Sequence, residues 1–178
     1  LTDNESVTEI LRFTDDIKGY LVMATKKGLI KKTSVDEFKH VNKNGKIAIK
    51  LIDGDKLISV DTTNGRDEII VATHDGKCIR FSEENIRNMG RNSQGVKSIS
   101  LNKKDYVVDM SVIKKGCQIL TISEKGYGKR SDPNDYRLQT RGGKGIKAGV
   151  FNDKTGKLVN LKQLKQDQDV ILISDNGT

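Results

Sequence analysis

The sequence predicts an all-β fold, built as an array of propeller-like blades with four short strands each. Four hairpin-like segments recur along the 178 residues, and the glycines that close their turns lie 48, 50 and 51 residues apart. These glycines are Gly28, Gly76, Gly126 and Gly177. No long stretch has the 3.6-residue apolar period of a helix. Four strands in each repeat of about 40–50 residues are typical of propeller blades, which bury their faces by stacking.

Each recurring segment predicts a β-hairpin. An aliphatic run such as residues 69–72 is followed by Ser or Thr, two polar residues and Gly. Glycine readily adopts the positive φ that a tight turn requires. In the first unit we expect strands at 7–11, 20–25, 29–33 and 46–51. Short helical turns fit residues 35–38 and 83–88.

Two further landmarks repeat with this period and place the outer strands. One is a glycine that precedes a strand-like stretch, at Gly45, Gly95 and Gly145. The other is an aliphatic residue that opens the first strand of each unit, at Val7, Leu57, Val107 and Leu158. We therefore expect a single repeat-built fragment over 1–178, with approximate units 5–51, 55–101, 105–151 and 156–178. The last unit is truncated, which leaves about three and a half blades and predicts a piece of a larger array.

Charge and composition narrow the functional classes. The chain has 32 Lys and Arg against 24 Asp and Glu, a net charge of +8, which favours a polyanionic partner. Aromatic residues make up only 4%, which disfavours binding of single strands by base stacking, whereas a duplex backbone requires only cations. No apolar stretch approaches the ~18 residues of a membrane span, so we expect no membrane association. Two cysteines and no basic leader predict a cytoplasmic protein.

A cation recurs four residues after the hairpin glycine of each complete unit, at Lys32, Arg80 and Arg130. A solvated strand face would also carry charge at this position. Recurrence at one structural position favours a shared surface track, along which a bent duplex could lie. The third unit is the most basic, because residues 123–150 hold seven cations and three acids, a net charge of +4.

A glycine-rich loop lies within this basic stretch and has the sequence Gln139-Thr140-Arg141-Gly142-Gly143-Lys144-Gly145. Bare backbone N–H groups between two cations can approach phosphates closely. A flexible basic turn between strands would have the same composition. We call residues 139–145 the box-like loop, for the following reason.

The box-like loop resembles the signature box of the C-terminal domain of the DNA gyrase A protein, whose usual form is Gln-Arg-Arg-Gly-Gly-Lys-Gly. Six of its seven positions match, and Thr140 replaces an Arg. Residues 34–38, 46–55 and 125–130 also resemble stretches of that domain, so the resemblance extends over essentially the whole chain. In the family the box lies in the first blade. Here it lies in the third unit, so we interpret it as a copy in a late blade of a chain that begins partway through the domain.

The resemblance implies a β-pinwheel, in which neighbouring blades exchange a strand. Domains of this kind bind double-stranded DNA on a positive rim and bend it around themselves. The whole enzyme, an A2B2 assembly of the gyrase A protein, which has the cleavage core, and the gyrase B protein, then introduces negative supercoils. ATP and Mg are used elsewhere in that assembly, so we expect no cofactor here. The DNA-binding residues expected are Lys31, Lys32, Lys43, Lys46, Arg80, Arg91, Lys97, Lys129, Arg130, Arg137, Arg141, Lys144 and Lys147.

We expect no catalytic residue and no metal ligand in the chain. Tyrosine chemistry on DNA needs an activating Arg and an acidic metal cluster, and neither Tyr127 nor Tyr136 is set in such a sequence. His40 and His74 have no second His or Cys at metal-ligand spacing. Both cysteines fall in strand-like runs, as small buried hydrophobes do.

Two other interpretations of the repeats stay open. The chain could be the related C-terminal domain of the topoisomerase IV A protein, which typically has fewer blades and lacks a clear box. The box-like loop argues against this alternative. The chain could also be a propeller-type protein-interaction module without a nucleic-acid function. A steep salt dependence of duplex binding would be incompatible with that third interpretation.

Overall fold

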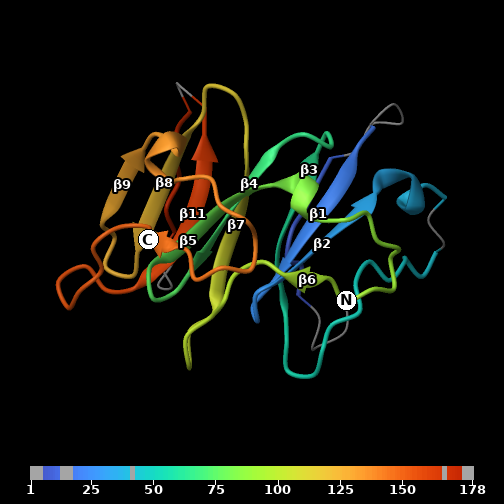
Figure 1. Ribbon diagram of the computed structural model, residues 1–178, viewed down its shortest axis with the longest axis horizontal. Helices are drawn as coiled ribbons and strands as arrows, with labels where there is room; N and C mark the ends of the chain where they lie inside the picture. The colour runs from blue at the N-terminus through green and yellow to red at the C-terminus, as the bar shows by residue number, and fades with distance from the viewer. Residues whose placement is uncertain (1–5, 13–17, 41–42, 166–167, 174–178) are drawn as a thin grey trace.

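The computed structural model describes residues 6–12, 18–40, 43–165 and 168–173, and their regular structure is three antiparallel sheets with three short 3-10 turns (Figure 1). The first sheet has the order β3 (Leu57–Thr63), β1 (Tyr20–Thr25), β2 (Leu29–Ser34) and β6 (Val96–Lys97). The second has the order β10 (Ile146–Lys147), β5 (Lys77–Ser82), β4 (Glu68–Thr73) and β7 (Val107–Ile113). The third has the order β11 (Leu158–Leu164), β8 (Gln118–Ser123) and β9 (Gly128–Ser131). The all-β prediction is confirmed.

The three predicted hairpins within the described residues all form, and a 3-10 turn follows each of them. These turns are η1 (Val35–Phe38), η2 (Glu83–Asn85) and η3 (Pro133–Asp135). Each starts after a capping Ser or Asp whose side chain accepts the N–H two residues on. The cap explains why the strand stops there, because the side chain satisfies a backbone donor that the strand ladder would otherwise hold.

The first two hairpins each take both of their outer strands from the following unit, and the third takes β11. The hairpin β1–β2 is flanked by β3, with Tyr20 opposite Thr63, and by β6, with Ile30 opposite Val96. The hairpin β4–β5 is flanked in the same way by β7 and β10 of the third unit. The exchange implied by the family resemblance therefore involves two strands, one on each side of a hairpin.

This exchange corrects the prediction of strands at 7–11 and 46–51. Both segments are irregular, and so are residues 168–173, where the sequence predicts the start of the fourth hairpin. The rest of that hairpin, from residue 174, lies outside the described residues. Residues 7–11 and 46–51 occupy the repeat positions of β3 and β6, but within the described part of the chain no hairpin pairs with them. The return strands at β6 and β10 are also shorter than predicted, with two residues each.

The core lies between the sheets. In β4, Ile69 and Val71 face the first sheet, whereas Ile70 and Ala72 face the third, and all four are fully buried. Alternate residues of a strand point to opposite faces of its sheet, so an unbroken aliphatic run marks a sheet that is covered on both sides. The outer face of the first sheet is covered by loop residues such as Leu11 and Ile49.

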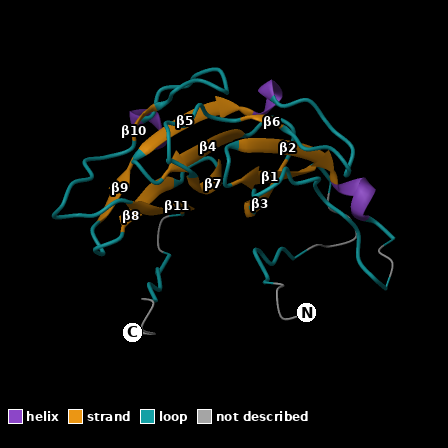
Figure 2. Cartoon of the chain, turned by 90° about the horizontal axis from the view of Figure 1, so that it is seen from below, coloured by secondary structure: helices purple, strands orange, loops and turns teal. Residues whose placement is uncertain are grey.

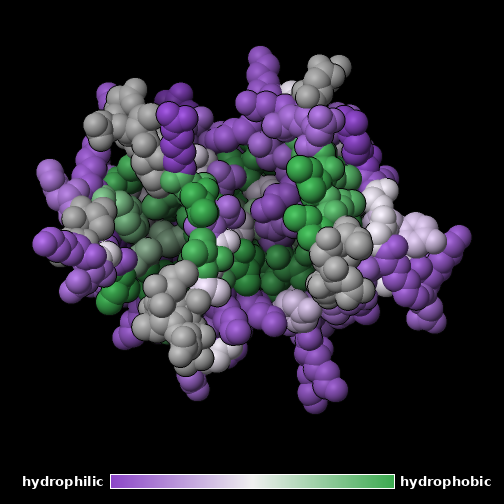
Figure 3. Space-filling model, turned by 180° about the vertical axis from the view of Figure 1, so that it is seen from behind, coloured by the Kyte–Doolittle hydropathy of each residue, from purple (hydrophilic) through white to green (hydrophobic). Residues whose placement is uncertain are grey.

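The sheets stand side by side in an arch (Figure 2). Strands β5, β6 and β10 lie on its convex side, and β3, β7 and β11 lie on its concave side. The view from behind, onto the concave side, shows apolar side chains gathered near the middle of the surface (Figure 3). Exposed aliphatic residues of the described chain include Val7, Ile10 and Ile171.

Candidate nucleic-acid interface

Two loops on the convex side (Figure 2) carry four of the thirteen predicted DNA-binding residues, namely Arg91, Arg137, Arg141 and Lys144. We call them the rim loops: residues 86–95 connect η2 to β6, and residues 136–145 connect η3 to β10. The box-like loop forms the end of the second rim loop. Each rim loop contacts the last segment of the preceding unit, around Ile47 or Lys97. The loops therefore overlap from one unit to the next along the arch.

An arginine fastens each rim loop to the preceding unit. The Nη1 atoms of Arg91 and Arg141 donate to the carbonyl oxygens of Ile47 and Lys97, at 3.0 Å in both cases. Arg141 Nε also donates to Asn85 O at 2.8 Å. The guanidinium of Arg141 therefore faces protein carbonyls, and the side chain is half-buried.

The glycines of the box-like loop serve the same contact. Gly142 N–H donates to Ser98 O at 2.6 Å, and Gly143 O accepts the Ser100 N–H at 2.8 Å. Gly145 has a φ of +69°, and a Cβ there would overlap the carbonyl oxygen of Cys78. Gly95 is in the same position one unit earlier, and its Cβ would lie 2.6 Å from Ile30 O. The prediction that this backbone is bare is thus wrong for Gly142, whose N–H is bonded within the protein.

The predicted surface track of recurring cations is wrong for Lys32, which is buried, and for Arg80, which is half-buried, because both side chains are directed into the protein. Lys32 Nζ donates to Glu83 O at 3.0 Å and lies 3.5 Å from the buried Glu83 carboxylate. Arg80 Nη1 donates to Pro133 O at 2.6 Å and to Tyr136 O at 3.1 Å, and Nη2 lies 2.5 Å from Glu68. The cation recurs because the 3-10 turn of the next unit presents carbonyls at this place.

Arg130 holds the same position in the third unit, and here the side chain is exposed, as is Lys129. Strand β9, which carries both residues, is the last strand of a three-stranded sheet among the described residues. No described 3-10 turn follows η3, so Arg130 meets Gln118 Oε1 instead of a turn.

Lys31 and Lys46 also donate to protein carbonyls. Lys31 is fully buried, and its Nζ donates to Ala48 O at 2.6 Å and to Arg91 O. Burial lowers the pKa of Lys31 to about 8, although the nearby Glu37 opposes that shift. Lys46 Nζ donates to Lys39 O at 2.7 Å and to Glu37 O at 3.1 Å. Lys31, which we expected to bind DNA, is therefore enclosed by the protein.

The remaining predicted cations are exposed, namely Lys43, Lys97, Lys129, Arg130, Arg137, Lys144 and Lys147. Lys97 and Lys147 are fifty residues apart, in β6 and β10. Arg87 is a further exposed cation, which sequence reasoning missed. It precedes the equally exposed Arg137 by fifty residues, and this spacing could have identified it. Units two and three therefore repeat an exposed pair, Arg87 with Lys97 and Arg137 with Lys147.

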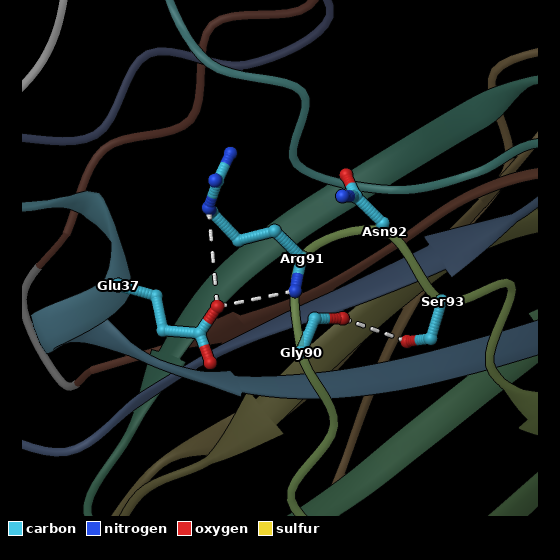
Figure 4. A pocket seen from close by; sticks show the side chains of 5 residues that line it. All are labelled: Glu37, Gly90, Arg91, Asn92 and Ser93. Atoms are coloured by element: carbon cyan, nitrogen blue, oxygen red, sulfur yellow. Dashed lines mark hydrogen bonds and ion pairs between the residues drawn. The ribbon is translucent and has the colours of Figure 1, made fainter.

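A shallow pocket beside the first rim loop is lined by Glu37, Gly90, Arg91, Asn92 and Ser93 (Figure 4). The Glu37 carboxylate accepts the Arg91 N–H at 3.2 Å and lies 3.9 Å from Arg91 Nε. The one cation among these lining residues, Arg91, thus lies beside a carboxylate of the protein, which makes the pocket a poor site for an anion.

The chain is similar to known proteins over nearly its whole length. A family model described as "DNA gyrase C-terminal domain, beta-propeller" matches residues 19–64, 67–114 and 118–165. The DNA gyrase A protein of Ureaplasma parvum serovar 3 is 42% identical over 174 residues, which are 98% of this chain and 21% of that protein. The DNA gyrase A protein of Staphylococcus epidermidis is 38% identical, over 99% of this chain and 20% of that protein. The chain belongs to the gyrase C-terminal domain family.

Solved structures agree with the gyrase C-terminal domain fold. A structure titled "Structure of DNA gyrase A C-terminal domain" has a TM-score of 0.74 and 25% identity, covering 93% of this chain and 60% of the other. The C-terminal domain of DNA topoisomerase IV has a TM-score of 0.84, with 22% identity, over 93% of this chain and 52% of the other. At that identity, the second likeness concerns the fold alone. The chain spans about a fifth of the length of its curated gyrase relatives.

Tyrosine, histidine and cysteine side chains of this gyrase-type domain also pack within the protein. Tyr136 is buried, which raises the pKa of its hydroxyl, and Tyr127 is half exposed beside Lys154. His74 stacks on Tyr106 and lies 3.1 Å from Glu124. Burial raises the pKa of the Cys78 thiol to about 12. Within the part of the chain that is described, no group of three or more His, Cys, Asp or Glu residues is placed to hold a metal ion. Among the same residues, no helix has the length and apolar character to span a membrane.

Proposed function

We propose that this chain is a DNA-wrapping part of the gyrase A protein, which binds double-stranded DNA along its convex rim and bends it. The observation that carries the proposal is the repeated exposed pair, Arg87 with Lys97 and Arg137 with Lys147. The arginines lie on the rim loops, which overlap from one unit to the next, and the lysines lie in β6 and β10. A convex, regularly charged surface suits a polyanion that curves around it. Contacts of this kind fall on phosphates, so we expect little sequence preference.

In the whole enzyme the wrap would present a DNA segment to the cleavage core of the gyrase A protein. Together with the gyrase B protein, in an A2B2 assembly in the cytoplasm, this would support ATP-dependent negative supercoiling. This part of the chain would supply binding and curvature, while ATP and Mg would be used elsewhere in the assembly. Bending 20–30 base pairs by 40–90° costs on the order of 1–6 kcal/mol, which phosphate neutralisation must offset.

The test is a titration of linear duplex against salt by mobility shift. Each phosphate contact should contribute about −0.9 to the slope of log K against log salt. If the affinity for duplex changed little with salt, the proposal would be contradicted. That result would favour a protein-interaction module. Ligation of nicked circles in the presence of the protein then tests for bending with a fixed hand. A shift in linking number is the expected result.

The topoisomerase IV alternative keeps the same fold, which the solved C-terminal domain of DNA topoisomerase IV shares. We favour gyrase because whole-chain identities of 36–42% to curated gyrase A proteins argue from sequence as well as fold. Supercoiling of relaxed plasmid, with this segment placed in a gyrase A protein that lacks its own, separates the two. Restored negative supercoiling is expected for a gyrase segment, and decatenation without supercoiling for the alternative.

A further inference from the structure

One cation of the box-like loop, Arg141, is less exposed to solvent than the lysines near it. Lys144 and Lys147 are exposed, whereas Arg141 is half-buried. Arg141 places two nitrogens on two carbonyls of the preceding unit, Nε on Asn85 O at 2.8 Å and Nη1 on Lys97 O at 3.0 Å. A planar guanidinium can reach two acceptors at once, which a lysine cannot do.

The Nη1 contact recurs one unit earlier, where the Nε atom lies near the Glu37 carboxylate and not on a carbonyl. Arg91 Nη1 donates to Ile47 O at 3.0 Å, and both arginines span 44 residues of sequence in doing so. The backbone bonds beside them also repeat, because Lys50 N–H donates to Ser93 O at 3.1 Å and Ser100 N–H donates to Gly143 O at 2.8 Å. Each rim loop is therefore fastened to the preceding unit through an arginine and through its backbone.

The acceptor in the later contact is the carbonyl of Lys97, an exposed rim cation. Arg141 thus fixes the backbone of Lys97 relative to Lys144, which follows it by three residues in the box-like loop. We propose that Arg141 is a positioning residue, which sets the spacing of phosphate-binding lysines across two blades and so the curvature imposed on DNA. This inference rests on the proposed function, and it assigns the phosphate contacts to Lys97, Lys144 and Lys147.

The experiment compares Arg141→Ala and Arg141→Lys with Lys144→Ala in the complete chain. Lys144→Ala should lower the magnitude of the salt slope by about 0.9 and keep the bend, measured as FRET between dyes at the ends of a duplex of about 30 base pairs. Arg141→Ala should keep the slope and lose the FRET signal of the bend. Arg141→Lys should resemble Arg141→Ala, since it keeps the charge without the fork.

Hydrogen exchange in the free protein gives a readout that does not depend on DNA. Exchange over residues 97–100 should become faster in Arg141→Ala and stay unchanged in Lys144→Ala, because the Arg141 side chain donates to Lys97 O. Arg91→Ala, which should act on residues 47–50, provides a second case if Arg141→Ala fails to fold.

The proposal is overturned if Arg141→Ala lowers the slope by about 0.9 while exchange over 97–100 is unchanged, which is the result expected of a direct phosphate contact. Full retention of the bend in Arg141→Ala would overturn it as well. If the unaltered chain binds duplex without salt dependence, the proposed function fails. The exchange measurement still decides in that case whether Arg141 fixes Lys97.

Discussion

Gly95 and Gly145 occupy the same place in successive units, and each lies against the backbone of an earlier hairpin. Both have positive φ, and neither leaves room for a Cβ beside the carbonyls of Ile30 and Cys78. Gly45 has the same positive φ, but nothing lies within 4 Å of its Cβ position. Glycine recurs at this position after fifty residues because the backbone there packs against a hairpin carbonyl of the preceding unit. A side chain would not fit at either Gly95 or Gly145.

Gly145→Ala is expected to destabilise the protein by about 3 kcal/mol or more, since a backbone clash adds to the cost of a strained φ. Gly45→Ala is the matched control and should cost only about 1–2 kcal/mol, which is the effect of the left-handed conformation alone. Denaturant unfolding followed by circular dichroism measures both. Equal losses would show that the close approach to Cys78 has no energetic weight.

Arg80→Ala and Arg130→Ala form a second matched pair, because both residues sit at one repeat position. Arg80 is half-buried against Glu68 and two carbonyls, so its loss leaves partly buried acceptors unpaired and should cost about 1–3 kcal/mol. Arg130 is exposed, and its loss should change stability by less than about 0.5 kcal/mol. Thermal unfolding of the two variants decides. A destabilised Arg130→Ala would mean that the exposed position also carries a structural contact.

Lys31 makes stability depend on pH in the alkaline range. Its pKa of about 8 lies below the ~10.4 of an unfolded chain, so the folded state binds fewer protons between these values. Stability should therefore rise as the pH increases from 8 to about 10, by up to about 3 kcal/mol. The test is urea unfolding at several pH values, with Lys31→Met as the control. The two proteins should differ in slope only above pH 8, and identical slopes would contradict the assignment.

At the scale of the element, hairpins follow from local patterns and outer strands do not. The runs at 20–25, 69–73 and 119–123, each closed by Gly, contain the whole signal for a hairpin, and all three form as predicted. The strands predicted at 7–11 and 46–51 share the pattern of β3 and β6 but are irregular. Their state depends on a pairing partner in another unit, about which a local pattern carries no information.

The inward orientation of Lys32 and Arg80 could not be predicted for the same reason. Recurrence at one position correctly indicates a shared role, but a surface contact and a contact between units produce the same spacing. The acceptors are carbonyls of η2 and of the residues around η3, and a carbonyl is present at every residue, so the sequence does not mark it. The exposed pair of Arg87 and Arg137, in contrast, is visible in the spacing.

Strand exchange predicts that damage to an outer strand is felt in the preceding unit. Val96→Pro should accelerate hydrogen exchange over residues 29–32, since Pro removes a donor from the pair of β6 with β2. Ile146→Pro should instead act on residues 77–80 in β5. Mass spectrometry of peptides from the two hairpins separates the effects. Faster exchange confined to the mutated unit would contradict the exchange of strands.

At the scale of the whole molecule, the sheets share two cores. One core joins the first and second sheets, and the other joins the second and third, so β4 contributes to both. Strand β11 completes the third sheet, and its Leu158 and Leu161 are fully buried in the second core. The stability of each sheet is therefore expected to depend on its neighbour, and β4 couples the first sheet to the third.

Truncation of the chain after residue 155 removes β11 and should expose the hairpin of β8 and β9. We expect loss of exchange protection over 118–131, a smaller loss over 68–82, and little change over 20–34, because the first core does not include β11. Peptide-resolved hydrogen exchange measures this gradient. Uniform loss over all three hairpins would indicate one indivisible core.

The two-sided strand exchange has a mechanical consequence. A bent duplex exerts an outward force on the surface that binds it. Blades joined only by flexible linkers would separate one at a time under such a force. In this chain, β3 precedes the second hairpin and β6 follows it, and both strands pair with the first hairpin, β1–β2. Drawing those two units apart means sliding β3 along β1, which loads their ladder of hydrogen bonds in shear.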